Sequence, residues 1–155
     1  MAGIKFSLDV KGLKNIETRM AAASKRASHD LATQVARDTE QYVPASGAPA
    51  GMYNRTQIEG DTIIYPGPYA RYLYYGKVMV NSATGKGPMH FYDKHGNEII
   101  MFPEGSTLRP TDRDLVFKKH HHKHAQAHWF EASKAQNLPK WIRFLGEALE
   151  REFGR

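Results

Sequence analysis

The feature that most constrains the fold is a long run of apolar residues at helical spacing. The run consists of Leu13, Ile16, Met20, Ala23, Ala27, Leu31, Val35 and Tyr42. Steps of three and four residues place such side chains on one face of an α-helix. The run predicts a helix over residues 12–43, roughly 40–45 Å long at 1.5 Å per residue. Val43 and Pro44 end it, because the residue before a proline is disfavoured in the α region.

Part of this stripe is poor in large side chains, over residues 21–23 and at Ala27. Small residues let a neighbouring element approach the helix axis closely. We therefore expect the helix to lie across a sheet or against a neighbouring subunit.

Patterns typical of strands and turns surround the helix. Alternating apolar residues predict a strand over residues 3–10. Residues 57–102 are predicted to form a β region with an exposed excursion at 81–88. Its strand candidates are residues 57–65, 70–80 and 98–102.

The remaining segments complete a single predicted α+β domain over residues 1–155. Residues 44–56 and 103–122 are predicted to be two long loops, and 124–153 a C-terminal helical region. Pro139 is expected to open the last helix. In this prediction the long N-terminal helix packs on a small antiparallel β-sheet, with a C-terminal helix beside it.

Composition excludes several classes of protein. The 155 residues include 22 Lys and Arg, 16 Asp and Glu and no Cys, so the formal net charge is +6. Without Cys there can be no disulfide framework, thiolate metal site or cysteine nucleophile. No apolar run reaches the ~20 residues that span a bilayer, and no signal-peptide pattern is visible. We expect no membrane partner, assembly in a reducing cytoplasm, and a polyanion or acidic protein as the first partner to consider.

A basic cluster near the C-terminal third has two readings. It consists of Lys118, Lys119, His120, His121, His122, Lys123 and His124. On a helix, His120, His124 and His128 would follow one another at i, i+4, a spacing that can hold a divalent metal in an enzyme. The interleaved lysines would repel a cation, so we favour a solvated or partner-facing loop without metal. Its charge suits docking on an acidic neighbour or non-specific contact with DNA, because no base-reading motif accompanies it.

Catalytic constellations are scarce. Ser24, Ser28 and His29 lie close together without a nucleophile elbow. Residues 85–87 lack the spacing of a phosphate-binding loop. We expect no catalytic residue, no cofactor and no enzymatic activity.

Tyrosines are concentrated in one short segment. Five of the eight Tyr fall between Tyr65 and Tyr75, with Arg71 among them. Aromatic residues beside Arg are typical of protein–protein interfaces, and they also stack on nucleic-acid bases. We favour a role in the core and in an interface over base stacking.

The tyrosine segment carries a resemblance to a family. The matching residues are Val43, Pro44, Gly51, Pro68, Tyr69, Ala70, Arg71, Tyr72, Tyr74, Tyr75, Gly76, Trp129 and Trp141. They resemble, in order, the V-P step after a long helix, a G-x-L-x-x-S-like stretch, a P-Y-A-x-x-x-Y-Y-G-like strand and late tryptophan elements. These are features of the minor capsid, neck and tail-completion proteins of tailed bacteriophages. Tyr53 stands where that family usually has Leu, and residues 81–122 match no family pattern.

The resemblance implies a structural protein of the virion, located at the head–tail junction and assembled in the cytoplasm of the bacterial host. It implies a ring of six or twelve copies, in which one patch of each copy meets a different patch on the next. The implied neighbours are connector or head-completion proteins on one side and tail-terminator or tail-tube proteins on the other, with the matching residues at interfaces. The alternative is a small basic protein that binds nucleic acid non-specifically through the cluster at 118–124 and the tyrosines.

Overall fold

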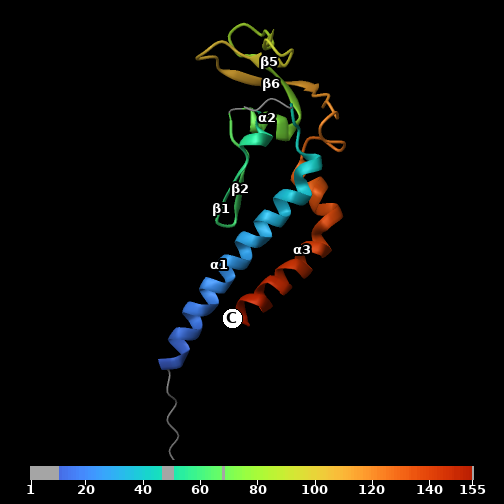
Figure 1. Cartoon of the computed structure of the whole chain (residues 1–155). Helices are drawn as coiled ribbons and strands as arrows, with labels where there is room; N and C mark the ends of the chain where they lie inside the picture. Colours follow the sequence, from blue (N-terminus) through green and yellow to red (C-terminus); the bar gives the residue numbers. More distant parts are fainter. Residues whose placement is uncertain (1–10, 47–50, 68, 155) are drawn as a thin grey trace, which may run out of the picture.

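Two long antiparallel helices form the body of the protein (Figure 1). The computed structural model describes residues 11–46, 51–67 and 69–154, so the strand predicted at residues 3–10 lies outside it. Helix α1 spans Lys11–Thr39 and continues as the 3-10 turn η1 (Glu40–Tyr42), which corresponds to the helix predicted at 12–43. Helix α3 spans Trp129–Phe153 and returns along α1.

The strands are distributed over three separate two-stranded antiparallel sheets. β1 (Gln57–Glu59) pairs with β2 (Thr62–Ile64), and β4 (Met89–Tyr92) pairs with β5 (Glu98–Met101). β3 (Lys77–Asn81) pairs with β6 (Leu108–Asp114). The α+β class with a long N-terminal helix and a C-terminal helix is confirmed, although the predicted single sheet is divided into these pairs.

The core lies between α1 and α3. Ala23, Ala27 and Val35 of α1 are buried, and so are Trp141 and Ala148 of α3. The buried small residues of α1 therefore accommodate a helix of the same chain, α3. The β1–β2 pair also contacts α1, which gives the long helix a small sheet on its other side.

The strand predicted at 70–80 is wrong in its first half, where the chain forms helix α2 (Ala70–Tyr75). Gly76 ends α2 at a φ of 69°, in the left-handed region, and its N–H donates to the carbonyl of Tyr72 at 2.8 Å. A Cβ at this glycine would lie 2.6 Å from Cβ of Ala127. The aromatic composition suggested a strand, but this glycine C-cap favours a short helix before β3.

The loop predicted at 103–122 is also wrong in part, because it contains β6. Pro110 of β6 lies opposite Met79 of β3, next to an irregularity in the register. The hydroxyl of Thr111 donates to the carbonyl of Val78 at 2.9 Å. Strand β6 forms because β3 supplies a backbone partner, which the polar and proline-containing sequence of β6 does not reveal.

The C-terminal region differs from its predicted form at its start and at Pro139. Residues 124–128 are not helical, and α3 begins at Trp129 after His128, whose φ is 49°. Pro139 lies inside α3 and does not open a separate helix. Helix α3 continues through Pro139 because the turns before the proline pack against the rest of the protein. Trp129 and Ser133 in these turns are both buried.

Candidate assembly surfaces

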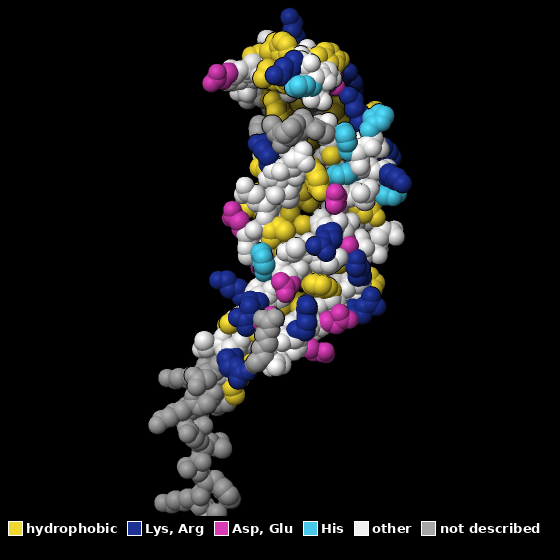
Figure 2. Space-filling view, in the orientation of Figure 1, with side chains coloured by type: hydrophobic (Ala, Val, Ile, Leu, Met, Phe, Trp, Pro, Cys, Tyr) yellow, Lys and Arg dark blue, Asp and Glu magenta, His cyan; other side chains and the backbone are white. Residues whose placement is uncertain are grey.

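The β4–β5 hairpin exposes an apolar face. Its register places Met89 opposite Met101 and Phe91 opposite Ile99, so these four side chains share one face. All four are exposed, Phe91 at 46%. Figure 2 shows hydrophobic side chains gathered at the end of the molecule that carries this hairpin. We call Met89, Phe91, Ile99 and Met101 the hairpin face.

The opposite face of the hairpin exposes Tyr92 and Ile100 and also carries a polar bridge. His90 Nδ1 lies 2.7 Å from Oε1 of Glu98, and Lys118 Nζ donates to Oε2 of the same carboxylate at 2.7 Å. The hydrogen bonds from Lys118 and His90 lower the pKa of Glu98, and Glu98 in turn raises the pKa of Lys118. The bridge therefore ties the hairpin to the segment that follows β6 and leaves the hairpin face uncovered.

The turn of the hairpin is fixed by one aspartate. The carboxylate of Asp93 accepts hydrogen bonds from the backbone N–H groups of His95 and Asn97, each at 2.8 Å. Hydrogen bonds from Asn97, first from its side chain and then from its backbone, lower the pKa of Asp93. A two-stranded hairpin alone is marginally stable in water, so such a turn helps to hold an apolar face in place. The exposed apolar face of the hairpin is therefore a candidate contact surface.

Sequence reasoning missed the hairpin face. The signal that could have found it is two short apolar-rich runs, residues 89–92 and 98–101, on either side of the turn residues Asp93 and Gly96. Gly96 has a φ of 79°, as a tight turn requires. The sequence predicts a strand over residues 98–102 but no partner strand beside it.

The tyrosine segment forms an aromatic cluster against α3. The ring of Trp129 meets Tyr74 edge-on at 4.8 Å and Tyr65 at 5.3 Å, and Trp129 itself is 2% exposed. The hydroxyl of Tyr74 donates to the carboxylate of Glu131. Burial and this hydrogen bond raise the pKa of Tyr74, and burial raises the pKa of Tyr65 to about 12.

The tyrosines therefore divide into two groups. Tyr65 and Tyr74 fasten α2 and the strands before it to the start of α3. Tyr69, Arg71 and Tyr75 are exposed, and Tyr72 and Ala70 are half-buried. Tyr69 also stacks on Phe102 at the base of the hairpin, with ring centroids 6.3 Å apart. The predicted interface role of this segment accordingly concerns its exposed members, while Pro68 lies outside the described residues.

The valine–proline step joins the end of α1 to the basic cluster. Val43 is buried, and its carbonyl lies 2.6 Å from Nδ1 of His122. The imidazole of His122 is buried too and meets the ring of Tyr53 edge-on at 4.6 Å. Pro44 and Gly51 are half-buried nearby in the sequence.

The basic cluster is thus divided by the structure. His122 is buried, His124 stacks on Tyr42 and Lys118 binds Glu98. Lys119, His120, His121 and Lys123 are exposed. The segment is not helical, so the i, i+4 arrangement of histidines does not form. Across residues 11–46, 51–67 and 69–154, no three His, Asp or Glu side chains converge as metal ligands would.

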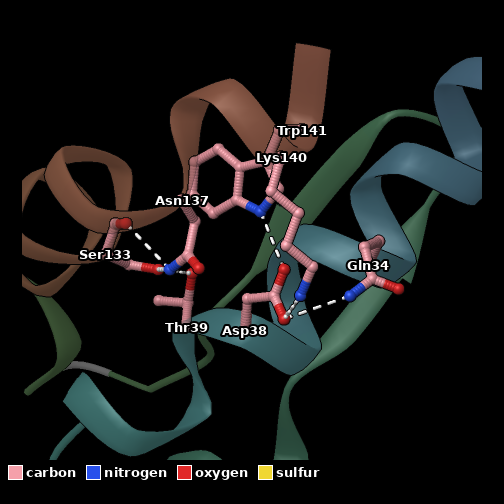
Figure 3. A network of polar contacts seen from close by, with 7 residues as sticks. All are labelled: Gln34, Asp38, Thr39, Ser133, Asn137, Lys140 and Trp141. Carbon is pink, nitrogen blue, oxygen red and sulfur yellow. Dashed lines mark hydrogen bonds and ion pairs between the residues drawn. The ribbon is translucent and has the colours of Figure 1, made fainter. Parts of the chain in front are cut away.

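A polar network locks α3 onto α1 (Figure 3). The carboxylate of Asp38 accepts hydrogen bonds from Lys140 at 2.6 Å and from the indole N–H of Trp141 at 2.9 Å. Burial raises the pKa of Asp38, but the hydrogen bonds from Lys140, Gln34 and Trp141 outweigh it, so the pKa lies below its usual value. Next to it, Thr39 donates to Ser133 at 2.9 Å, and both are buried. Trp141 is therefore part of the helical core, which differs from the interface role that the resemblance implied for it.

A second exposed apolar surface lies on α3. Leu138, Ile142 and Phe153 are exposed, Ile142 at 64%, and Leu145 and Leu149 between them are half-buried. We call these five residues the α3 seam. Within the parts of the chain that the structure describes, no helix is apolar enough over a sufficient length to cross a membrane.

Comparison with known proteins points to one family. No curated protein and no solved structure matches the chain. The family described as minor capsid protein matches residues 4–101, a range that includes α1, the tyrosine segment and the hairpin. Because this match covers more than half of the 155 residues, the chain belongs to the minor capsid protein family and is a structural component of a virion.

Proposed function

We propose that this minor capsid protein is a subunit of the head–tail junction of a tailed bacteriophage or prophage. In this proposal it forms a neck or tail-completion ring of six or twelve copies that joins the connector to the tail. Its role is structural, without catalysis or a cofactor. The observation that carries the proposal is the hairpin face, a projecting apolar surface that the described part of the chain leaves uncovered.

The hairpin face suits a neighbouring virion protein for two reasons. The four exposed apolar side chains of this face give a compact contact area without a charged residue among them. The hairpin also projects from the helical pair, so it can reach a neighbour without disturbing the core (Figure 1). Head-completion or tail-terminator proteins are the neighbours that this location implies.

The test is electron microscopy of particles produced with the Phe91→Glu variant. A carboxylate at the centre of the hairpin face would have to be buried unpaired in the contact, which opposes assembly. We expect tail-less heads or detached tails, with the protein absent from the particle. Lys94→Glu, in the exposed hairpin turn, is the matched control and should give normal particles. Normal particles from both variants would refute the hairpin contact. Antibody labelling of this protein on the capsid shell alone, away from the head–tail junction, would refute the proposed location.

A second candidate function is non-specific contact with DNA, either by the isolated protein or by the assembled protein while the genome passes through the junction. It is favoured by four exposed basic side chains within five residues, Lys119, His120, His121 and Lys123. Phosphate contacts of this kind weaken steeply as salt concentration rises. Binding of the purified protein to duplex DNA should therefore appear at low salt and collapse on titration with salt. No binding at low salt removes this candidate.

A further inference from the structure

The β4–β5 hairpin buries little of its own surface. Seven of its eight strand residues are exposed, and the eighth, Glu98, is half-buried. Figure 1 shows the hairpin at the end of the molecule that lies away from the C-terminus of α3. A segment with so few buried side chains moves readily unless particular contacts hold it. The contacts between the hairpin and the rest of the chain therefore decide the direction in which it points.

Asn81 fastens the chain on both sides of the hairpin. Its backbone N–H donates to the carbonyl of Lys86 at 2.8 Å, and its side-chain amide donates to the hydroxyl of Ser106 at 3.1 Å. The chain is therefore tied to the β3–β6 pair as far as Lys86 on one side and from Ser106 on the other. Between these points, residues 87–88 lead into β4 and residues 102–105 lead out of β5.

The two connections form a pivot at the base of the hairpin. Phe102 follows β5, and its ring stacks on Tyr69 with ring centroids 6.3 Å apart. On the other connection, Gly87 has open space around it, so its backbone can rotate without a clash. The base of the hairpin is thus held at Phe102 and free to turn at Gly87.

A polar contact holds the hairpin at its far end. Glu98 is the first residue of β5 and precedes Phe102 by four residues, which places it about 13 Å from the pivot. Its carboxylate oxygens lie 2.7 Å from Nδ1 of His90 and 2.7 Å from Nζ of Lys118. His90 belongs to the hairpin itself, so Lys118 is the residue that joins the hairpin to the body. We call the ion pair between Glu98 and Lys118 the clasp.

The segment that carries Lys118 is fixed to the body of the protein. The N–H of Leu115 donates to the carbonyl of Gly76 at 2.8 Å. The ring of Phe117 lies 3.9 Å from the place that a Cβ on Gly76 would take. A contact between this fixed segment and the far end of a pivoting hairpin controls the direction of the hairpin. We propose that the β4–β5 hairpin is a hinged arm, which the clasp holds in one orientation and which swings about its base when the clasp opens.

A change in ionic strength is enough to open the clasp. The side chain of Lys118 is 74% exposed and that of Glu98 is 23% exposed. Ion pairs between exposed groups are weak and are screened by salt. The arm should therefore be held at low salt and freed at high salt. The inference rests on the proposed function where it concerns assembly, because the clasp then sets the direction of the hairpin face before a neighbour binds.

The test is the distance between two spin labels on the purified full-length protein. The chain contains no Cys, so nitroxide labels can be attached at chosen positions. Lys94→Cys in the hairpin turn and Gln136→Cys on α3 provide two exposed positions. Double electron–electron resonance measures the distribution of distances between them. At low salt the labelled protein should give one narrow distribution.

Loss of the clasp should broaden this distribution. Lys118→Met and Glu98→Gln each remove the ion pair, and both should add a broad component. Sodium chloride should broaden the distribution of the labelled parent protein in the same way. Lys119→Met is the matched control, because it removes the same charge at the adjacent exposed position and should leave the distribution narrow. Circular dichroism verifies that every variant keeps its helices.

Three results would each overturn the proposal. The first is a distribution that stays narrow in both clasp variants, and the second is a parent protein whose distribution is already broad at low salt. The third is equal broadening by Lys119→Met, which would assign the effect to net charge. These measurements concern the isolated protein, so the arm can fail its test while Phe91→Glu still blocks assembly, and the reverse outcome is equally distinguishable.

Discussion

The helical pair and the β4–β5 hairpin differ in how much apolar surface the chain itself covers. In the helical pair, Trp141 is 5% exposed and its indole N–H is bonded to a carboxylate. In the hairpin, Phe91 and its neighbours on the same face have no covering element among the described residues. The comparison teaches that the helical pair covers its own apolar side chains and so contributes to the stability of the monomer, whereas the hairpin leaves its apolar face exposed. Substitutions of similar chemistry should therefore have opposite consequences in the two regions.

The largest expected loss of stability is for Trp141→Ala in the helical pair. The change removes a buried indole and leaves a cavity, which costs ~3–5 kcal/mol of the free energy of unfolding. Urea denaturation followed by circular dichroism measures it. Trp141→Phe keeps most of the ring and removes the hydrogen bond to Asp38, so it should cost about 1–2 kcal/mol. Equal losses for both variants would contradict the assignment of the ring to the core.

The next largest effect is expected at Gly76, which joins the tyrosine segment to the strands. In Gly76→Ala the residue would retain a positive φ, and its Cβ would meet that of Ala127 at 2.6 Å. We expect a loss of about 1–3 kcal/mol in the free energy of unfolding. Adding Ala127→Gly should recover the part of the loss caused by the close contact and leave the part caused by the backbone. No loss in the single variant would contradict the tight approach of the two segments.

The long helices and the region between them differ in how readily the sequence predicts them. The helices follow from the spacing of residues such as Ile16 and Leu145, because amphipathic periodicity persists over many turns. Helix α2 does not follow, because five tyrosines in a short segment favour a strand while the C-cap that decides the conformation is a single glycine, Gly76. Strand β6 depends on pairing with β3, which is a non-local contact.

The candidate surfaces were predictable only in part. The motif residues Val43 and Trp141 were singled out by resemblance, but both are buried in this chain. The hairpin face was not predicted, because exposure of apolar side chains depends on which elements fail to cover them. Sequence periodicity indicates that a side chain is apolar and on which face it lies, and only the packed structure shows whether that face is covered.

A smaller, pH-dependent loss of stability is expected for Asp38→Asn, which weakens the polar network between α1 and α3. Because the pKa of Asp38 is lowered in the folded protein, its charge stabilises the fold above its usual pKa of 3.8. The stabilisation disappears as the pH falls through the folded-state pKa. The variant should lose about 1–2 kcal/mol near neutral pH, and its difference from the wild type should shrink below about pH 4. A difference that is independent of pH would contradict the role of the carboxylate charge.

The smallest effect on the monomer is expected for Ile99→Ser in the hairpin face. This side chain is exposed in the folded chain, so truncation removes little buried surface and should change the free energy of unfolding by less than about 0.5 kcal/mol. Incorporation into particles should nevertheless fall, because the same side chain would be buried against a partner. Urea denaturation of the purified variant, together with its abundance in purified particles, measures both consequences. A large loss of stability would place Ile99 in the fold of the monomer, and unchanged incorporation would remove it from the contact. Either result would contradict the difference between the two regions, since that difference requires stability and assembly to separate at this position.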